Sequence, residues 1–272
     1  MRFVADTHVH IYPGYNIGSF LYYALKNLAA CATTSFQDGA GEKVVKALFL
    51  TERSDCHFFR SIANGALNVP GEVLPVDDTA MRYSSISGDE IYIFAGRQIV
   101  TAERLEVLAL LTDFQIADGS PIRQVIEAVR GVGGVVVLPW SAGKWLGSRG
   151  ALMKELVMEL PPDGIFIGDS ALRPRVVREP AVFKLASKRG IKVLSGSDPL
   201  PLEGEERRVA SIVSSWQSCF DDGQVSESVR QGLLDPKLRL STYGDRITSF
   251  KLVKTLINLR ADKRKGQSSC LD

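Results

Sequence analysis

At 272 residues, the chain is long enough for one large α/β domain or two small ones. Hydrophobic residues make up 45% of it and charged residues 24%, which is ordinary for a soluble globular protein. The net charge of +2 gives no reason to expect a nucleic-acid partner, so none is predicted.

The cysteines and the apolar runs indicate where in the cell the protein is expected to be. The four cysteines share no CxxC or zinc-ribbon spacing, which indicates reduced thiols and not a disulfide framework. The apolar runs 17–32 and 131–140 are interrupted or too short to span a bilayer. The chain opens on a strand with no secretory signal. We therefore expect a soluble, cytoplasmic protein with no membrane span and leave its oligomeric state open.

The first predicted strand, 2–5, leads into Asp6-Thr7-His8-Val9-His10, which holds two of the three histidines. Side chains alternate along a strand, so His8 and His10 are expected to point the same way, with Asp6 behind them. Two such imidazoles can bind one divalent metal ion, and Asp6 can orient one of the two imidazole rings. The alternative is a capped strand end with solvated histidines.

Strands and helices alternate through the next part of the chain. The patterns predict a helix over 19–32, a strand over 43–51, a short helix over 56–66, a hairpin of 80–85 and 90–94, and a strand over 105–111. The third histidine, His57, lies in the short helix and is expected to pack locally.

The alternation continues to about residue 200, and polar residues follow most of the strands. The patterns predict helices over 120–130, 151–160 and 181–189, and strands over 135–138, 164–168 and 191–194. About seven core strands separated by helices indicate a parallel barrel or a related α/β fold, with its chemistry at the carboxyl ends of the strands.

From residue 203 the chain is predicted to be largely helical. Five apolar residues make one face of its last helix: Ile247, Phe250, Val253, Leu256 and Ile257. A basic run, 260–265, follows and could touch a membrane or a partner, but we expect the helix to pack on the domain. The predicted organisation is a barrel over 1–202, a helical extension over 203–272 packed on it, and a flexible tail over 261–272.

The order of the strand ends resembles the PHP (polymerase and histidinol phosphatase) family. Six segments carry the resemblance, DTHVH at 6–10, TERSD at 51–55, GRQ at 96–98, EVLAL at 106–110, LPW at 138–140 and GSDPL at 196–200. They stand where that family has DxHxH, TDHD, GxE, HxLG, AHP and GSDxH. The resemblance covers about residues 2–201. It implies an α/β fold of the distorted (β/α)7 TIM-like barrel type, here with a helical C-terminal extension, and one to three metals at its mouth.

The departures from the family pattern limit the metal site. Carried over residue by residue, only His8, His10 and Asp198 keep unchanged ligand chemistry. The other positions hold Arg53, Gln98, Glu106, Pro139 or Trp140, and Leu200. A trinuclear site cannot be assembled from them, but three ligands suit one divalent ion with a fourth position open. Zinc, manganese and iron are not distinguished, and a site without metal is also allowed.

Charged residues at the predicted mouth suggest roles in catalysis and in substrate binding. Glu106 or Glu52 could be a fourth ligand or a general base, and Arg97 is assigned to the catalytic group with them. Substrate binding is assigned to Arg53, Lys144, Trp140 and Arg173. Arginine forks bind phosphate or carboxylate, so a small anionic substrate is expected. Alternatively, the arginines pair with nearby carboxylates.

Three functions remain open at this point. The first is a PHP-like metal-dependent hydrolase with a single-metal site, acting on a small phosphoester or another anionic ester. The second is a hydrolase of the amidohydrolase superfamily, where HxH and a late Asp also recur, acting on an amide or a lactone. The third is a catalytically inactive barrel that binds an anionic ligand or a protein partner.

Overall fold

Strand β1 (Arg2–Val9) lies near the middle of a seven-stranded sheet in the computed structural model, which describes residues 1–35, 43–141 and 143–268. The order of this first sheet is β12-β11-β1-β2-β5-β4-β3. Its other strands are β2 (Val44–Leu50), β3 (Glu72–Asp77), β4 (Ala80–Ser84), β5 (Glu90–Phe94), β11 (Ile212–Gln217) and β12 (Ser241–Gly244). β1 pairs in parallel with β2 and antiparallel with β11.

The second sheet has five strands in the order β10-β9-β8-β7-β6. They are β6 (Gly96–Val100), β7 (Glu106–Leu110), β8 (Val135–Pro139), β9 (Ile165–Ser170) and β10 (Lys192–Gly196). β8, β9 and β10 are parallel, whereas β7 runs antiparallel to both of its neighbours. The first residue of β7 therefore lies at the same edge as the last residues of β8 and β9.

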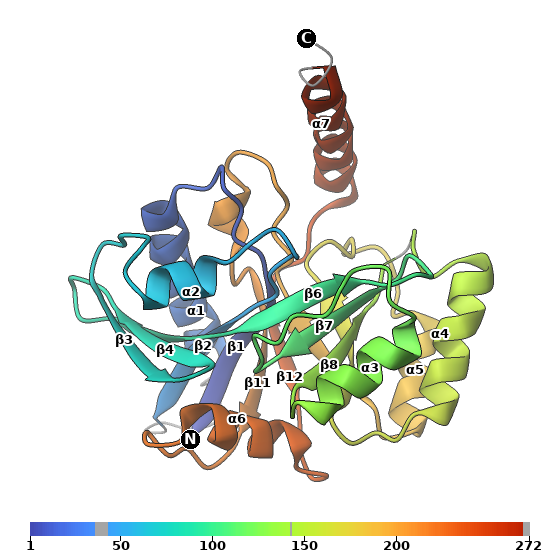
Figure 1. Cartoon of the computed structure of the whole chain (residues 1–272), viewed down its shortest axis with the longest axis horizontal. Helices are drawn as coiled ribbons and strands as arrows, with labels where there is room; N and C mark the ends of the chain where they lie inside the picture. The colour runs from blue at the N-terminus through green and yellow to red at the C-terminus, as the bar shows by residue number, and fades with distance from the viewer. Residues whose placement is uncertain (36–42, 142, 269–272) are drawn as a thin grey trace.

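Helices cover the outer faces of the two sheets (Figure 1). α1 (Ile17–Ser35) packs on the first sheet through a core that contains Phe20, Leu21 and Leu28. α3 (Ile122–Gly131), α4 (Gly147–Glu159) and α5 (Ala181–Lys188) pack on the second. A third core fills the space between the sheets and includes residues of α6 (Val225–Leu234). The short elements α2 (Phe58–Ala63) and the 3-10 helix η2 (Glu205–Arg208) complete the body, and α7 (Ser249–Ser268) projects from it.

A β-bulge in β1 sets which face its last residues occupy. Before the bulge, Val4 packs in the core under α1 and Phe3 in the core between the sheets, as alternation requires. Asp6 is then opposite Leu48 and Val9 opposite Leu50, so β1 has one residue more than β2 between these pairs. One extra residue reverses the alternation. Residues 8 and 10 consequently face the space between the sheets.

The prediction of a closed (β/α)7 TIM-like barrel is wrong, although the α/β class is right. The edge of β1 that would pair with β10 is occupied by β11, beyond which β12 ends the sheet. At the other side, the described β-pairing between the β2 and β6 segments is an isolated bridge between Glu52 and Arg97. Neither junction forms a continuous ladder, so two mixed sheets lie face to face and no barrel closes.

Residues 203–272 are not simply helical, because they supply β11 and β12 to the first sheet. This part of the fold prediction is therefore wrong as well, whereas the boundary at residue 202 stays a prediction. Of the predicted flexible tail, 261–272, residues 269–272 lie outside the described part of the chain, and α7 continues through Ser268.

Several local predictions are confirmed. The hairpin over 80–85 and 90–94 is the antiparallel pair of β4 and β5, and the predicted helices at 120–130 and 181–189 are α3 and α5 within a few residues. Among the helices of the described residues, none is both long and apolar enough to cross a membrane.

Candidate metal centre

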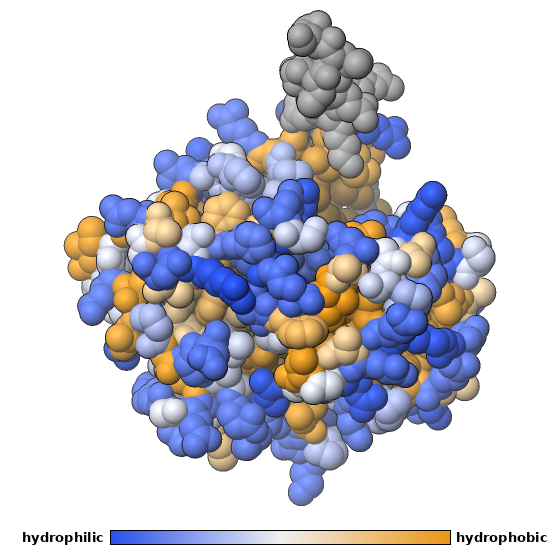
Figure 2. Space-filling view, in the orientation of Figure 1, coloured by the Kyte–Doolittle hydropathy of each residue, from blue (hydrophilic) through white to orange (hydrophobic). Residues whose placement is uncertain are grey.

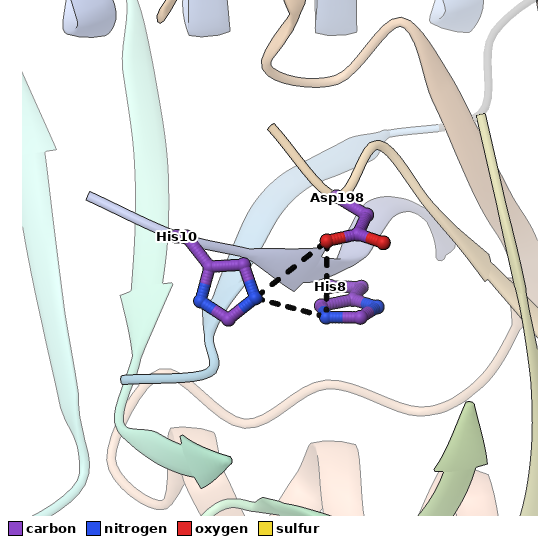
Figure 3. A group of neighbouring side chains, drawn as sticks. All are labelled: His8, His10 and Asp198. Carbon is purple, nitrogen blue, oxygen red and sulfur yellow. Dashed lines mark hydrogen bonds and ion pairs between the residues drawn. The ribbon is translucent and has the colours of Figure 1, made fainter. Parts of the chain in front are cut away.

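Three side chains converge where β1 and β10 end: His8, His10 and Asp198 (Figure 3). The Nε2 atoms of the two imidazoles are 3.1 Å apart. One oxygen of the Asp198 carboxylate lies 3.5 Å from Nε2 of His8 and 3.7 Å from Nε2 of His10. The sequence predicted this group across 190 residues of chain, and its members could bind a metal ion.

The distances match what a tetrahedral ion requires. With metal–ligand bonds of about 2.0–2.1 Å, the ligand atoms of a tetrahedral site are about 3.3 Å from one another. The three observed separations, 3.1, 3.5 and 3.7 Å, lie around that value. The imidazole contact would also suit an N–H···N hydrogen bond, but the carboxylate facing both rings completes a three-ligand set with one open position.

The electrostatics favour neutral, ligating imidazoles. Burial lowers the pKa of His8 to about 4 and the pKa of His10 to about 3. Both rings are thus neutral near pH 7, so each keeps one N–H and has one nitrogen lone pair to offer. Burial also raises the pKa of Asp198. A divalent cation would relieve this cost, because it favours the charged carboxylate.

The backbone holds Asp198 in an unusual conformation. Its φ is 50°, in the left-handed region that few residues other than glycine adopt. Its N–H donates to the carbonyl of His8 at 2.8 Å, which ties the turn after β10 to β1. Strained backbone of this kind persists where the surroundings fix it, and it concentrates at functional sites.

Asp6 supports the site through the main chain and not through an imidazole. Its carboxylate is completely buried and accepts from the N–H groups of His8, Ser197 and Ala210 at 3.2, 2.8 and 2.7 Å. The hydroxyl of Ser197 donates to it as well. Asp6 was predicted to share a face with the two histidines, but the bulge puts it on the opposite one. It fastens the end of β1 to the loops after β10 and before β11.

Gly196 gives a prediction that tests how tightly this region is built. A Cβ at position 196 would lie 2.3 Å from the backbone nitrogen of His8 and 2.8 Å from a carboxylate oxygen of Asp6. We expect Gly196→Ala to displace His8 and to lower metal affinity by about 10–100-fold, as loss of a supporting contact does in other metal sites. Titration of the protein with zinc measures the metal affinity. Gly131→Ala, whose Cβ would meet nothing within 4 Å, is the control; equal affinities would contradict the packing argument.

A cavity of about 710 Å³ opens beside the three ligands, within the usual range for a small-molecule site. It lies where the carboxyl ends of strands from both sheets meet. Its lining includes His8, His10, Asp198, Gln98, Glu106, Lys144, Arg53, Trp140, Asp169, Leu256 and Leu259.

Glu106 and Lys144 form an ion pair inside this cavity. The Glu106 charge raises the pKa of His8 and the Lys144 charge lowers it, although burial outweighs both, which places the pair within electrostatic reach of the ligands. Gln98 also lines the cavity, and its side chain raises the pKa of His8, against the larger effect of burial. The sequence rated Gln98 only as a weak amide ligand and thus missed this role, which a motif comparison cannot reveal.

Three of the four residues assigned to substrate binding line the cavity, and the fourth does not. Arg53, Lys144 and Trp140 line the cavity. The Arg53 side chain is 46% exposed, and its guanidinium pairs with Asp55 at 2.8 Å. Arg173 does not line the cavity. Its guanidinium donates two hydrogen bonds, of 2.8 and 2.6 Å, to the carboxylate of Asp169, which does.

Glu52 and Arg97, assigned to catalysis, are not among the described residues that line the cavity. They lie in a buried ion-pair network where β2 meets β6. The Arg97 guanidinium is 3.3 Å from Glu52, pairs with Asp113 and donates to the carbonyl of Cys56. Glu52 accepts from the N–H of Phe59 at 2.7 Å. The backbones are joined as well, because Gln98 N–H donates to the Glu52 carbonyl.

The Glu52 carboxyl predicts a specific pH dependence of stability. Burial raises its pKa from 4.5 to about 7, against the opposing effects of Phe59 N–H and Arg97. Between these values the folded protein binds more protons than the unfolded chain, so the free energy of unfolding falls as pH rises through that window. We expect Glu52→Gln to flatten this slope, measured by urea unfolding from pH 4 to 8. The buried Asp6 acts in the same direction, so the difference between the two proteins is the test; parallel curves would contradict it.

Comparison with known proteins shows which solved structures share the fold but does not assign the chain to a family. No family model and no curated protein sequence matches the chain. Among solved structures, PsfC from Pseudomonas syringae PB-5123 is 16% identical over 96% of this chain and 98% of its own, with a TM-score of 0.57. The lesion-specific endonuclease PfuEndoQ from Pyrococcus furiosus is 11% identical over 90% of this chain, with a TM-score of 0.53. A complex of Endonuclease Q with a 27-mer duplex bearing an abasic lesion gives 10% identity over 86% of this chain and a TM-score of 0.50.

These likenesses show a shared fold. The chain corresponds to 59% and 56% of the two endonuclease chains, but to nearly all of PsfC. They also correct one prediction. The small net charge was taken to argue against a nucleic-acid partner, yet a protein with this fold has been solved on a DNA duplex. The exclusion of nucleic acid is therefore wrong: a global net charge does not report the local surface that meets a substrate.

Proposed function

We propose that the protein is a PHP-like metal-dependent hydrolase of a phosphoester, with one divalent ion held by His8, His10 and Asp198. The observation that carries the proposal is the tetrahedral spacing of these three ligand atoms beside an open cavity. An ion in this position supplies a Lewis acid and a source of hydroxide near neutral pH. The residues fit such an ion, because both imidazoles are neutral and a carboxylate completes the set.

The other residues of the cavity and its surroundings would accept the proton, bind the phosphoryl group and position the site. Glu106 lies in the cavity within electrostatic reach of His8, which suits it to accept a proton from the attacking water. Lys144 and Arg53 bring positive charge to the same wall and would bind the phosphoryl oxygens. Glu52 and Arg97 act as positioning residues in this account, because they hold β6, and with it Gln98, against the site.

One observation favours an enzyme over an inactive binding protein. The Arg53 guanidinium pairs with Asp55 and does not close the mouth with a glutamate, so the cavity beside the proposed ligands stays open. A phosphodiester of nucleic acid is the second candidate substrate, favoured by the fold shared with Endonuclease Q. A cavity of about 710 Å³ would admit one nucleotide drawn out of a strand, not a duplex.

The test is reconstitution. Protein stripped by a chelator is loaded with zinc, manganese or iron(II) and assayed on p-nitrophenyl phosphate, bis-p-nitrophenyl phosphate, a lactone, an amide and a duplex with an abasic site. We expect metal-dependent hydrolysis of at least one phosphoester, lost in Asp198→Ala and kept in Glu155→Ala, which removes an exposed carboxylate outside the cavity lining. Hydrolysis of the lactone or amide alone would favour the amidohydrolase alternative. Bound metal without hydrolysis of any of these substrates would favour the inactive binder.

A further inference from the structure

The cavity lining contains apolar residues that the proposed chemistry does not use. Besides the ligands and the Glu106–Lys144 pair, the wall includes Trp140, Leu172, Leu200, Pro201, Leu256 and Leu259. Leu256 is 46% exposed, and Trp140 is only partly buried although it packs edge-on against Phe183. A cavity lined by both charged and apolar residues is suited to a ligand with one anionic end and one apolar end.

Two of these wall residues come from α7, a helix far from the other lining segments in the chain. α7 rises from the body (Figure 1), and apolar residues are seen at its base on the face shown in Figure 2. Leu256 and Leu259 face the cavity, whereas Val253 and Ile257, which are 56% and 59% exposed, are not among its lining residues. The helix thus offers a cavity-facing pair and a matched outward pair.

The start of α7 is fastened to the cavity itself. Ile247, two residues before the helix, donates its N–H to Ala171 at 2.8 Å and accepts from the N–H of Arg175 at 3.2 Å. Arg246 pairs at 2.7 Å with Asp169, which lines the cavity at the end of β9. These contacts fix where the helix leaves the body, so Leu256 and Leu259 are held at the mouth.

We propose that Leu256 and Leu259, together with Trp140, form a subsite for a planar apolar group carried by the phosphoester, so that α7 selects the substrate. The inference rests on the proposed function, since Arg53 and Lys144 would hold the phosphoryl end. Burial of the leucine side chains against the substrate supplies the selectivity, because apolar contact area removed from water favours binding. An aryl ester and a nucleobase present the same flat apolar face, and the binding experiment below separates the two.

Binding of non-hydrolysable phosphonates tests the subsite without any turnover. Isothermal titration of the metal-loaded protein compares phenylphosphonate with methylphosphonate, and a nucleoside 5′-phosphonate separates a base from a simple aryl group. We expect the wild type to prefer phenylphosphonate. Leu256→Ala/Leu259→Ala should lower that preference by about tenfold while leaving the Kd of methylphosphonate unchanged within about twofold. Val253→Ala/Ile257→Ala should leave both unchanged.

Leu256→Ala alone removes only a half-exposed side chain and should show a smaller effect in the same direction, so a folding defect of the double variant does not decide the result. An unchanged preference in both cavity-facing variants would overturn the subsite even if phosphoesters are hydrolysed. Conversely, a selectivity that depends on the leucines in a protein that hydrolyses no phosphoester would uphold the subsite and reject the proposed reaction. A wild type that does not distinguish the two phosphonates also overturns the subsite.

Discussion

Replacing His8 and His10 with alanine is expected to leave a folded protein that no longer holds a metal ion. The two imidazoles are two of the three proposed ligands, and their Nε2 atoms lie 3.1 Å apart. Even supporting residues outside a ligand set change metal affinity by about 10–100-fold, so loss of two ligands should exceed 100-fold. Elemental analysis of the purified proteins, with zinc titration after chelation, measures the effect. Hydrolysis, where the wild type shows it, should fall by about 10³-fold or more, equivalent to about 4 kcal/mol.

The third histidine provides the control. His57 is exposed, and its ring nitrogen is 3.3 Å from Arg97, away from the cavity. His57→Ala should keep full metal content. Thermal unfolding in the presence of chelator tells whether the double variant is folded. Equal metal content in the wild type and the folded double variant would remove the proposed site, and hydrolysis that survives in the double variant would place the chemistry elsewhere.

Replacing Arg97 with methionine is expected to be the most destabilising of the substitutions considered. Its guanidinium is almost completely buried and faces two carboxylates, those of Glu52 and Asp113. Removing one partner of a buried pair leaves uncompensated charge and typically costs about 3–5 kcal/mol. Urea unfolding at pH 7 measures the loss.

Two further proteins make the Arg97 result interpretable. Arg53→Met removes a half-exposed arginine with a single 2.8 Å partner and should cost no more than about 1 kcal/mol. Without Arg97, which lowers the Glu52 pKa, the buried Glu52 carboxyl should be protonated at pH 7, so adding Glu52→Gln to Arg97→Met should change the stability little at pH 7 and recover part of it at higher pH. If Arg97→Met were as mild as Arg53→Met, the network would not be what joins β2 to β6.

The grouping of His8, His10 and Asp198 could be predicted from the sequence because it depends on short-range patterns. Two histidines separated by one residue must share a face of a strand, and an aspartate after the last parallel strand must lie at the same edge. Those statements hold whatever the details of the sheet. The bulge that decides which face the histidines occupy is different: one extra residue in β1 shows only against its partner, Leu48 to Leu50 of β2.

That the barrel stays open could not be predicted, because closure is a property of strand pairing over long distances. β11 (IVSSWQ) is short and rich in serine, and its signal is weak beside the helical patterns around it. Yet its pairing with β1 occupies the edge where a barrel would close. In the same way, motif spacing cannot tell that Arg97 turns away from the cavity while its neighbour Gln98 reaches His8. The leucines of α7 have no motif at all.

The most direct test of the account is to locate the ion. Crystals of the wild type soaked in zinc, measured on both sides of the zinc absorption edge, should show one anomalous peak about 2.0–2.2 Å from His8 Nε2, His10 Nε2 and an Asp198 oxygen. A peak at any other place, or no peak at this one under saturating zinc, would contradict the assignment of these three residues as the metal centre.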